Sequence, residues 1–215
     1  MELRYRRRSI DIDGRRIRLR TLLNSQQFDD PDNLAEALGV SSATWPLFGV
    51  VWPSGEVLAR TMASEEVSGR RILEVGCGIA LPSLLLQLRG ADMSATDHHP
   101  LAGAFLRHNL SLNDAGDIAF SRSEWRDLGT SLGLFDLIIG SDLLYEPEHA
   151  EILSSFISRH AAPGCEAVIV DPGRGNAARF AKRMAQHHFT VEESRPRFSE
   201  LAEPFTGRLQ RYHRS

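Results

Sequence analysis

Short apolar runs that alternate with helical segments constrain the fold of this chain more than any other feature. From residue 71 onward, strand-like runs occur at residues 72–75, 93–96, 118–120, 135–140 and 167–170. Segments with helical spacing separate them, at residues 80–88, 101–112, 148–160 and 176–187. This alternation predicts an α/β fold with a mostly parallel sheet and helices on both of its faces. Apolar stretches at 189–191 and 209–213, joined by a proline-containing link, are expected to add two final strands.

The first part of the chain follows a different pattern. Isoleucine and leucine alternate with polar residues from Ile10 to Leu19 across Asp13-Gly14, which predicts a β-hairpin with a tight turn. We then expect a short helix at 34–38, a loop at 41–53 and a second helix at 55–63. The chain is therefore divided into a hairpin and helical extension at residues 1–65, packed on an α/β core at residues 66–215.

Length and composition exclude several classes of protein. The chain has 215 residues, of which 42% are hydrophobic, so a single core can form without disulfides or structural metals. No apolar run approaches the roughly 20 residues that a membrane-spanning helix needs, and no apolar segment of a secretory signal follows the basic N-terminus. Cys77 and Cys165 are the only cysteines, too few for a disulfide framework. A cytoplasmic protein is the resulting expectation.

Charge is distributed unevenly along the chain. The first 20 residues hold eight arginines against Glu2, Asp11 and Asp13, so they carry +5 while the whole chain carries -3. A basic edge of this kind favours attraction to nucleic acid or to an acidic protein surface. A solvated strand edge explains the same charges without a partner.

The most informative motif is a glycine loop placed where the first core strand meets a helix. Gly76 and Gly78 allow a tight turn there and let a ligand approach the backbone. Leu81 stands where a dinucleotide-binding motif has its third glycine, and Glu74 would oppose a phosphate but suits an ammonium group. Asp97, at the end of the second core strand, is placed to bind ribose hydroxyls. A ligand with a ribose, an ammonium and no phosphate is S-adenosylmethionine.

With these residues in place, the chain resembles the class I S-adenosylmethionine-dependent methyltransferases over roughly residues 45–214. Within them it is most similar to seven-strand protein-lysine methyltransferases, especially the branch that modifies the β-subunit of electron-transfer flavoprotein. Three segments carry the resemblance: Trp-Pro-Ser-Gly at 52–55, Asp-Leu-Leu-Tyr at 142–145 and Asp-Pro-Gly-Arg at 171–174. Ala80 departs mildly from the glycine of many members. The resemblance implies a Rossmann-like seven-stranded sheet and a protein substrate.

The expected cofactor contacts come from several loops at the carboxyl ends of the strands. Glu74 is assigned to the ammonium of the cofactor, and Gly76, Cys77 and Gly78 to its methionine and ribose portions. Asp97 is assigned to the ribose, His98 to the side of the adenine, and Ser141 to the same cofactor site. Glu124 and Trp125 are expected at the adenine, where packing in the core is the alternative for the indole, and Trp52 is expected over the methionine end.

Two other roles are disfavoured for residues of this region. Cys77 is not expected to act as a nucleophile, because no basic partner adjoins it in sequence. His98 and His99 suggest a metal, but no second cluster has ligand spacing, so no metal is predicted.

Asp142 and Tyr145 are the candidate catalytic residues. They follow the fourth core strand at the sheet edge where open α/β folds bind ligands. If the acceptor is lysine, its ammonium must first lose a proton. Tyr145 is expected to form a desolvating wall, and Asp142 to guide the amine or accept its proton. The alternative for Asp142 is that it only holds the following turn.

Other functions stay open at this stage. The chain could methylate a small molecule, or a protein histidine or arginine, or it could bind the cofactor without turnover. A nucleic-acid substrate is disfavoured, because residues 141–145 lack the Asn-Pro-Pro-Tyr type of motif that grips a flipped base.

Overall fold

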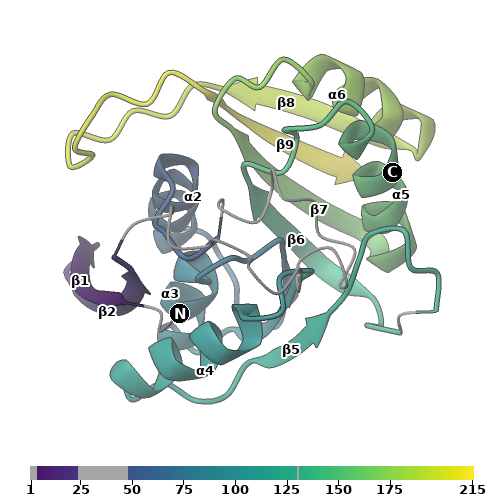
Figure 1. Ribbon diagram of the computed structural model, residues 1–215. Coiled ribbons are helices and arrows are strands. Elements are labelled where there is room, and N and C mark those ends of the chain that lie inside the picture. The colour runs from purple at the N-terminus through teal and green to yellow at the C-terminus, as the bar shows by residue number, and fades with distance from the viewer. Residues whose placement is uncertain (1–3, 24–47, 130) are drawn as a thin grey trace.

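A central seven-stranded sheet organises the molecule (Figure 1). The computed structural model describes residues 4–23, 48–129 and 131–215 of the chain. The strands of the sheet are β3 (Arg71–Val75), β4 (Asp92–Asp97), β5 (Ala119–Arg122), β6 (Phe135–Ser141), β7 (Ala161–Asp171), β8 (Phe189–Ser194) and β9 (Arg208–Arg214). Their order across the sheet is β5-β4-β3-β6-β7-β9-β8. All neighbours pair in parallel except β9, which is antiparallel to β7 and β8. The predicted mostly parallel, Rossmann-like sheet is confirmed.

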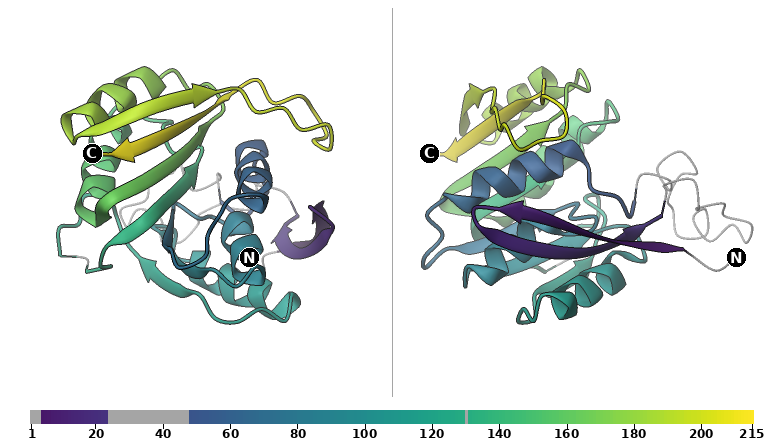
Figure 2. Two further views of the ribbon diagram at one scale, coloured as in Figure 1. Left: turned by 180° about the vertical axis from the view of Figure 1, so that it is seen from behind. Right: turned by 90° about the vertical axis from the view of Figure 1, so that its left-hand side faces the viewer.

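Helices cover both faces of the sheet (Figures 1 and 2). One face carries α2 (Pro53–Ala63), α3 (Leu81–Leu88) and α4 (Ala102–Leu112), and the other carries α5 (His149–His160) and α6 (Ala177–Gln186). Successive side chains of a strand point to opposite faces. Ile72 accordingly packs with the first group of helices, while Leu73 packs with the second. Both are fully buried, so the central strands are apolar on both sides.

The predicted hairpin is present as β1 (Tyr5–Ile12) and β2 (Arg15–Leu22). Asp13 and Gly14 between them have φ values of 49° and 72°, the left-handed conformation that a two-residue hairpin turn requires. The apolar face of the hairpin is buried in the same core cluster as α2, α3 and α4. The hairpin therefore forms an outer layer on these helices (Figure 2).

Two buried asparagines, Asn109 in α4 and Asn113 directly after the last residue of α4, attach β2 to the core. The main-chain N–H of Arg20 donates to Asn109 Oδ1 at 2.8 Å, and the N–H of Arg18 donates to Asn113 Oδ1 at 2.8 Å. Asn113 Nδ2 in turn donates to the carbonyl of Arg18 at 2.7 Å. Side-chain amides thus take the place of a neighbouring strand and satisfy this edge of the hairpin.

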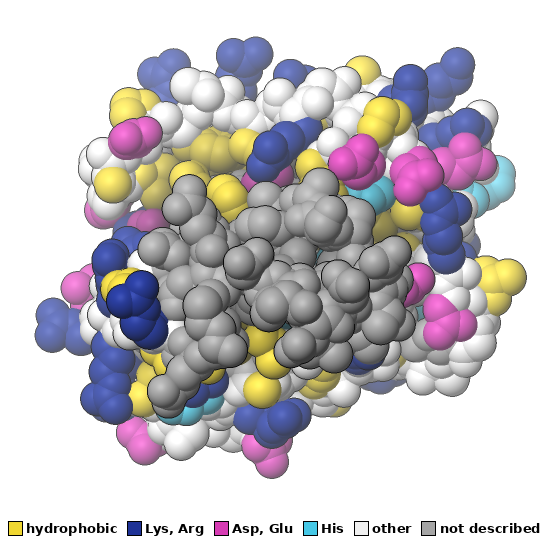
Figure 3. All heavy atoms as spheres, viewed as in Figure 1, with side chains coloured by type: hydrophobic (Ala, Val, Ile, Leu, Met, Phe, Trp, Pro, Cys, Tyr) yellow, Lys and Arg dark blue, Asp and Glu magenta, His cyan; other side chains and the backbone are white. Residues whose placement is uncertain are grey.

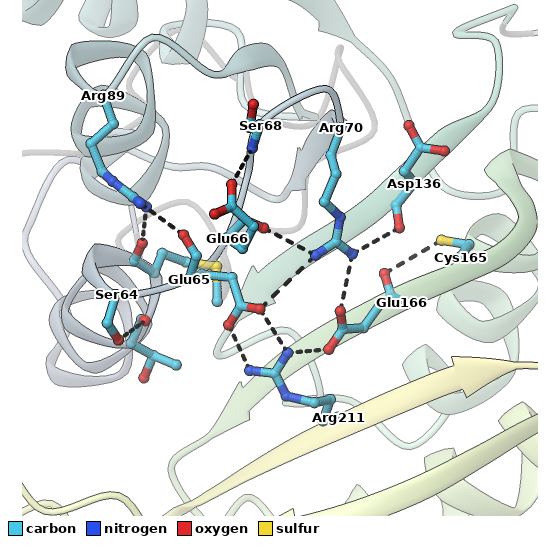
Figure 4. A network of polar contacts seen from close by, with 12 residues as sticks. Ser64, Glu65, Glu66, Ser68, Arg70, Arg89, Asp136, Cys165, Glu166 and Arg211 are labelled. Carbon is cyan, nitrogen blue, oxygen red and sulfur yellow. Dashed lines mark hydrogen bonds and ion pairs between the residues drawn. The ribbon is translucent and has the colours of Figure 1, made fainter.

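A half-buried ionic network joins the end of α2 to the sheet (Figure 4). Arg211 on β9 pairs with Glu65 at 2.8 Å and with Glu166 on β7, which also pairs with Arg70 at 3.0 Å. Although burial opposes ionisation of Glu166, its hydrogen bonds from Arg211 and Arg70 hold its pKa below the usual value. The network ties the residues on either side of the expected boundary at 65/66 together.

Most predicted elements agree with the structure to within a few residues. An exception is β7, which begins at Ala161 and not near residue 167. The expected helix at 34–38 and most of the expected loop at 41–53 lie outside the described residues. Within the described part of the chain, every helix is too short or too polar to cross a membrane.

Candidate functional site

The carboxyl ends of β3, β4 and β6 open into one cavity. This is the edge at which ligands bind to open α/β sheets. The lining residues are Phe48, Trp52, Gly76, Gly78, Asp97, His98, His99, Trp125, Ser141, Asp142, Leu143, Tyr145 and Arg174. Nine of the twelve residues that the sequence assigned to the site are therefore brought together here: Trp52, Gly76, Gly78, Asp97, His98, Trp125, Ser141, Asp142 and Tyr145.

The glycine loop follows β3 and is shaped by close packing. Gly76 has a φ of 62°, and a Cβ atom placed on it would lie 2.5 Å from Leu143 Cδ2. Gly140 at the end of β6 is similarly close, since its Cβ would lie 2.5 Å from Leu143 Cδ1. The Leu143 side chain therefore packs closely against the backbone of two glycines, and it lines the cavity.

Gly78 and Asp97 form the part of the loop that faces a ligand. The N–H of Gly78 donates to Asp97 Oδ2 at 2.7 Å, and the N–H of His99 donates to Oδ1 at 2.7 Å. A Cβ on Gly78, whose φ is 54°, would meet no atom within 4 Å. Two amides thus hold the carboxylate at the cavity wall, beside open space at the backbone of Gly78.

Glu74 and Cys77 do not line the cavity. Glu74 is buried and accepts hydrogen bonds from the N–H of Ser83, at 2.9 Å, and from its hydroxyl. Burial raises the pKa of Glu74 to about 8, despite these bonds. Burial, with the charges of Asp97 and Glu74, also raises the pKa of the Cys77 thiol. A thiol held neutral is a poor nucleophile, and a contact of Glu74 with a cofactor ammonium stays a prediction.

Aromatic side chains form the walls of the cavity. The ring of His149 on α5 lies edge-on between Trp125, at a centroid distance of 5.2 Å, and Tyr145, at 4.4 Å. On the other side Phe48 stacks on His99 at 3.9 Å. Burial raises the pKa of Tyr145 to about 12 and lowers that of His99 to about 3. Both rings are therefore neutral near pH 7.

Glu124 lies in an adjoining pocket and not in the cavity itself. It is exposed and lines this second pocket together with His98, Arg122, Ser123 and Asp127. His98 borders both the cavity and this pocket. An adenine that contacts Glu124 would therefore have to reach from the cavity past His98 into the pocket. Its role stays a prediction.

Asp142 is bound by an arginine that the sequence analysis did not place in the site. Arg174 Nε and Nη2 donate to the two carboxylate oxygens of Asp142 at 2.8 and 3.0 Å. These bonds raise the pKa of Arg174. Asp142 also has a φ of 55°, a conformation that is uncommon for a residue other than glycine. The Asp-Pro-Gly-Arg segment at 171–174 drew attention to Arg174 in the sequence, but nothing in that segment indicated that Arg174 would bind Asp142.

Three features of the cavity lining suit the chemistry of S-adenosylmethionine. Asp97 presents carboxylate oxygens for ribose hydroxyls, and the open backbone at Gly78 leaves room for a ligand to approach. Trp125 and Phe48 offer apolar faces for flat or aliphatic groups. Among the described residues, no group of His, Cys, Asp or Glu is arranged to hold a metal ion.

Comparison with known proteins identifies relatives of this chain. A family described as lysine methyltransferase matches residues 41–187. The electron transfer flavoprotein beta subunit lysine methyltransferase of Xenopus laevis is 30% identical over 147 residues, which cover 66% of this chain and 58% of that protein. Its counterpart from Danio rerio is 30% identical over 158 residues, covering 69% and 60%. A histone-arginine methyltransferase of Mus musculus is 31% identical over 108 residues, covering 47% and 43%. The chain thus matches less than two thirds of the length of these relatives.

Solved structures show the same fold. The 16S rRNA N2 G1207 methyltransferase of T. thermophilus, in complex with AdoMet and guanosine, has a TM-score of 0.67 at 18% identity, covering 100% of this chain and 52% of that one. A ribosomal protein L11 methylase from Lactobacillus delbrueckii has a TM-score of 0.62 at 19% identity, covering 79% and 83%. The resemblance to class I methyltransferases is confirmed. Because its family match spans more than half of its residues, this chain belongs to the lysine methyltransferase family.

Proposed function

We propose that the chain transfers a methyl group from S-adenosylmethionine to the side-chain nitrogen of a lysine in a protein. One observation carries the proposal. A single cavity joins Asp97, which suits a ribose, to Asp142 and Tyr145, which suit an amine. Membership of the lysine methyltransferase family supports the same reading.

Residues at the ends of β3, β4 and β5 would hold the cofactor. Asp97 would accept hydrogen bonds from the ribose, Gly78 would let the ligand lie against the backbone, and Trp125 would cover the adenine. When bound, S-adenosylmethionine supplies a methyl group that is activated by a neighbouring sulfonium. The protein therefore has to align the acceptor with that methyl group and exclude water from the two.

Deprotonation of the acceptor is the remaining requirement. A lysine with a pKa of about 10.4 needs about 4.6 kcal/mol to lose its proton at pH 7. The aromatic wall around Tyr145 desolvates the amine, which favours its neutral form, and the proton passes to solvent water as the lysine enters. An isolated carboxylate would work against this, because it would stabilise the ammonium. The pairing of Asp142 with Arg174 reduces that attraction while leaving lone pairs on Asp142 to orient the amine.

The nature of the relatives suggests the acceptor protein. The first candidate is the β-subunit of an electron transfer flavoprotein, named in the relatives from Xenopus laevis and Danio rerio. The relative that modifies histone arginine makes a protein arginine the second candidate. A guanidinium keeps its proton far more firmly than an ammonium, so that reaction would need a stronger base than the neutralised Asp142 offers.

Transfer of radiolabel from S-adenosylmethionine tests the proposal. The purified chain is incubated with the labelled cofactor and with lysate or purified flavoprotein β-subunit, and labelled protein is hydrolysed to amino acids. We expect methyllysine, and we expect it to be lost with Asp97→Ala but kept with Asp92→Ala, an exposed aspartate at the other end of β4. Label in methylarginine, in nucleic acid or in a small molecule would contradict the proposal, as would equal loss in both variants.

A further inference from the structure

The outer edge of β1 meets no hydrogen-bond partner among residues 4–23, 48–129 and 131–215. Arg18 and Arg20 of β2 direct their main-chain groups toward α4. Their register partners Ser9 and Arg7 must direct theirs the opposite way, because alternate residues of an antiparallel pair face outward. Over the described parts of the chain, the N–H and C=O groups that face outward from β1 make no hydrogen bond; they belong to Tyr5, Arg7, Ser9 and Asp11. All four residues are exposed.

Positive charge lies along the same edge. Arg6, Arg7 and Arg8 are consecutive in β1, are exposed, and form no ion pair within the described residues. In the space-filling view, arginine side chains gather on the left side of the molecule, over β1 and β2 (Figure 3). Charged side chains often protect a free strand edge from pairing with other chains. Three unpaired positive charges repel basic segments but attract acidic ones.

The edge continues into a groove that reaches the candidate site. Arg8 lines a groove of about 710 Å³ together with Glu203 from the segment that joins β8 to β9. Trp52, Asp142 and Arg174 line this groove and also the cofactor cavity. The segment from β8 to β9 extends past the end of α2, on the same side of the molecule as the hairpin (Figures 1 and 2). A chain bound along β1 would therefore lie at the mouth of the site.

From these three observations we propose that the acceptor protein binds through an extended acidic segment that adds as a strand to the free edge of β1. Backbone hydrogen bonds to residues 5, 7, 9 and 11 give the segment its register. Acidic side chains on it meet Arg6 to Arg8, and its lysine enters the groove past Arg8 toward Asp142. Only the entry of a lysine into the groove rests on the proposed function. The binding of an acidic strand to the edge of β1 does not depend on methyl transfer.

Two other occupants fit the edge less well. A second copy of this chain, paired edge to edge through β1, would bring the arginines of the two copies close together, and like charges across a strand pair are destabilising. Nucleic acid would match the charge but not the alternating donors and acceptors of a strand edge. The unpaired backbone groups therefore favour a protein segment.

Binding can be measured without turnover, by fluorescence anisotropy in the presence of S-adenosylhomocysteine. The probe is a fluorescein-labelled peptide in which glutamate alternates with valine around one lysine. Ser9→Pro removes an outward N–H without breaking a bond to β2, and Ser9→Ala is its matched control. The double variant Arg6→Glu/Arg8→Glu reverses the charge, and Arg15→Glu, at the other end of the hairpin, is the control for charge.

We expect Ser9→Pro to weaken peptide binding by about tenfold or more, the loss expected from one or two edge hydrogen bonds. The double variant should weaken it by about tenfold or more because it replaces attraction with repulsion. Both controls should stay within about twofold of the unmodified chain. In NMR hydrogen exchange, the peptide should slow the amides of residues 7, 9 and 11 and not those of residues 8 and 10. This second measurement uses the unmodified chain, so it stands even if Ser9→Pro disturbs the hairpin.

Several results would overturn the inference. They are failure of the peptide to bind, equal binding by Ser9→Pro, and no slowing of the alternate amides. Tighter binding of a labelled oligouridine than of the peptide would assign the edge to nucleic acid, and a dimer in sedimentation that Ser9→Pro dissolves would assign it to a second copy. Peptide binding combined with no methyllysine in the radiolabel assay would instead refute the proposed function and keep the strand edge, so the two failures can be told apart.

Discussion

Replacing Gly78 with alanine should reduce cofactor affinity much more than stability. The φ of Gly78 is 54°, and alanine in the left-handed region costs about 1–2 kcal/mol. Alanine also lowers the conformational entropy of the unfolded chain, which offsets about 0.4–1 kcal/mol of this loss of stability. A net loss of about 1 kcal/mol lowers the thermal midpoint by about 2–4 °C in a chain of this size.

The effect on binding has a different origin. The added methyl group would meet no atom of the described residues within 4 Å, so it would extend into the cavity that Gly78 lines. If the cofactor lies there, the methyl group crowds it, and overpacking by one carbon costs about 1–3 kcal/mol. That range corresponds to a loss of affinity of about 5- to 150-fold.

Two other glycines provide matched controls. Gly90 has a φ of 81° with no atom within 4 Å of its Cβ position, and it lies outside the cavity, so Gly90→Ala should repeat the stability loss without the affinity loss. Gly76→Ala adds the clash with Leu143 and should lose about 2–4 kcal/mol in total. Thermal denaturation without ligand and calorimetric titration with S-adenosylhomocysteine measure the two effects. Normal affinity in Gly78→Ala would refute the placement of the cofactor against this loop.

Three further predictions concern single carboxylates and the tyrosine. Asp97→Ala should weaken binding of S-adenosylhomocysteine by about 1–3 kcal/mol, as measured by calorimetry, and unchanged binding would remove Asp97 from the ribose site. Asp142→Asn should lower kcat by about 10²-fold, the loss expected when the acceptor is misplaced, with little change in cofactor affinity, and Tyr145→Phe should be milder than Tyr145→Ala. Full activity in Asp142→Asn would leave that carboxylate a structural role. The pKa of Glu74 is raised to about 8 by burial, so the folded state binds a proton that the unfolded state has lost above its ordinary pKa. The free energy of unfolding should therefore fall as pH rises from about 5 to about 8. Urea denaturation at a series of pH values in that range measures this change. The free energy of unfolding should depend less steeply on pH in Glu74→Gln than in the unmodified chain, and an equal dependence on pH in both proteins would contradict a buried neutral carboxyl group.

The sequence alone was sufficient for most of the helices and strands and for most of the residues that line the candidate site. Strand and helix periods depend on neighbours a few residues apart, so the alternation after residue 71 predicted the sheet and the helices on its faces. The turn at Asp13-Gly14 was equally local, because it depends on backbone conformations that these two residue types allow. The loop at Gly76 and Gly78 and the position of Asp97 followed from the order of the first two core strands. Parallel strands place such ends side by side.

Other features depended on contacts between residues far apart in the chain. Arg174 reaches Asp142 from 32 residues away, and Asn109 completes the edge of β2 from 89 residues away. The hydrogen bonds that the Glu74 carboxylate accepts from Ser83 likewise depend on how α3 packs beside β3, whereas the expected contact of Glu74 with a cofactor ammonium stays a prediction. Local sequence limits which conformations a segment adopts, whereas the partner of a charge or of a strand edge depends on which segments the whole fold brings together. The free edge of β1 is visible only at that level, because its neighbour β2 is satisfied by side chains of α4 and nothing in the described chain does the same for β1.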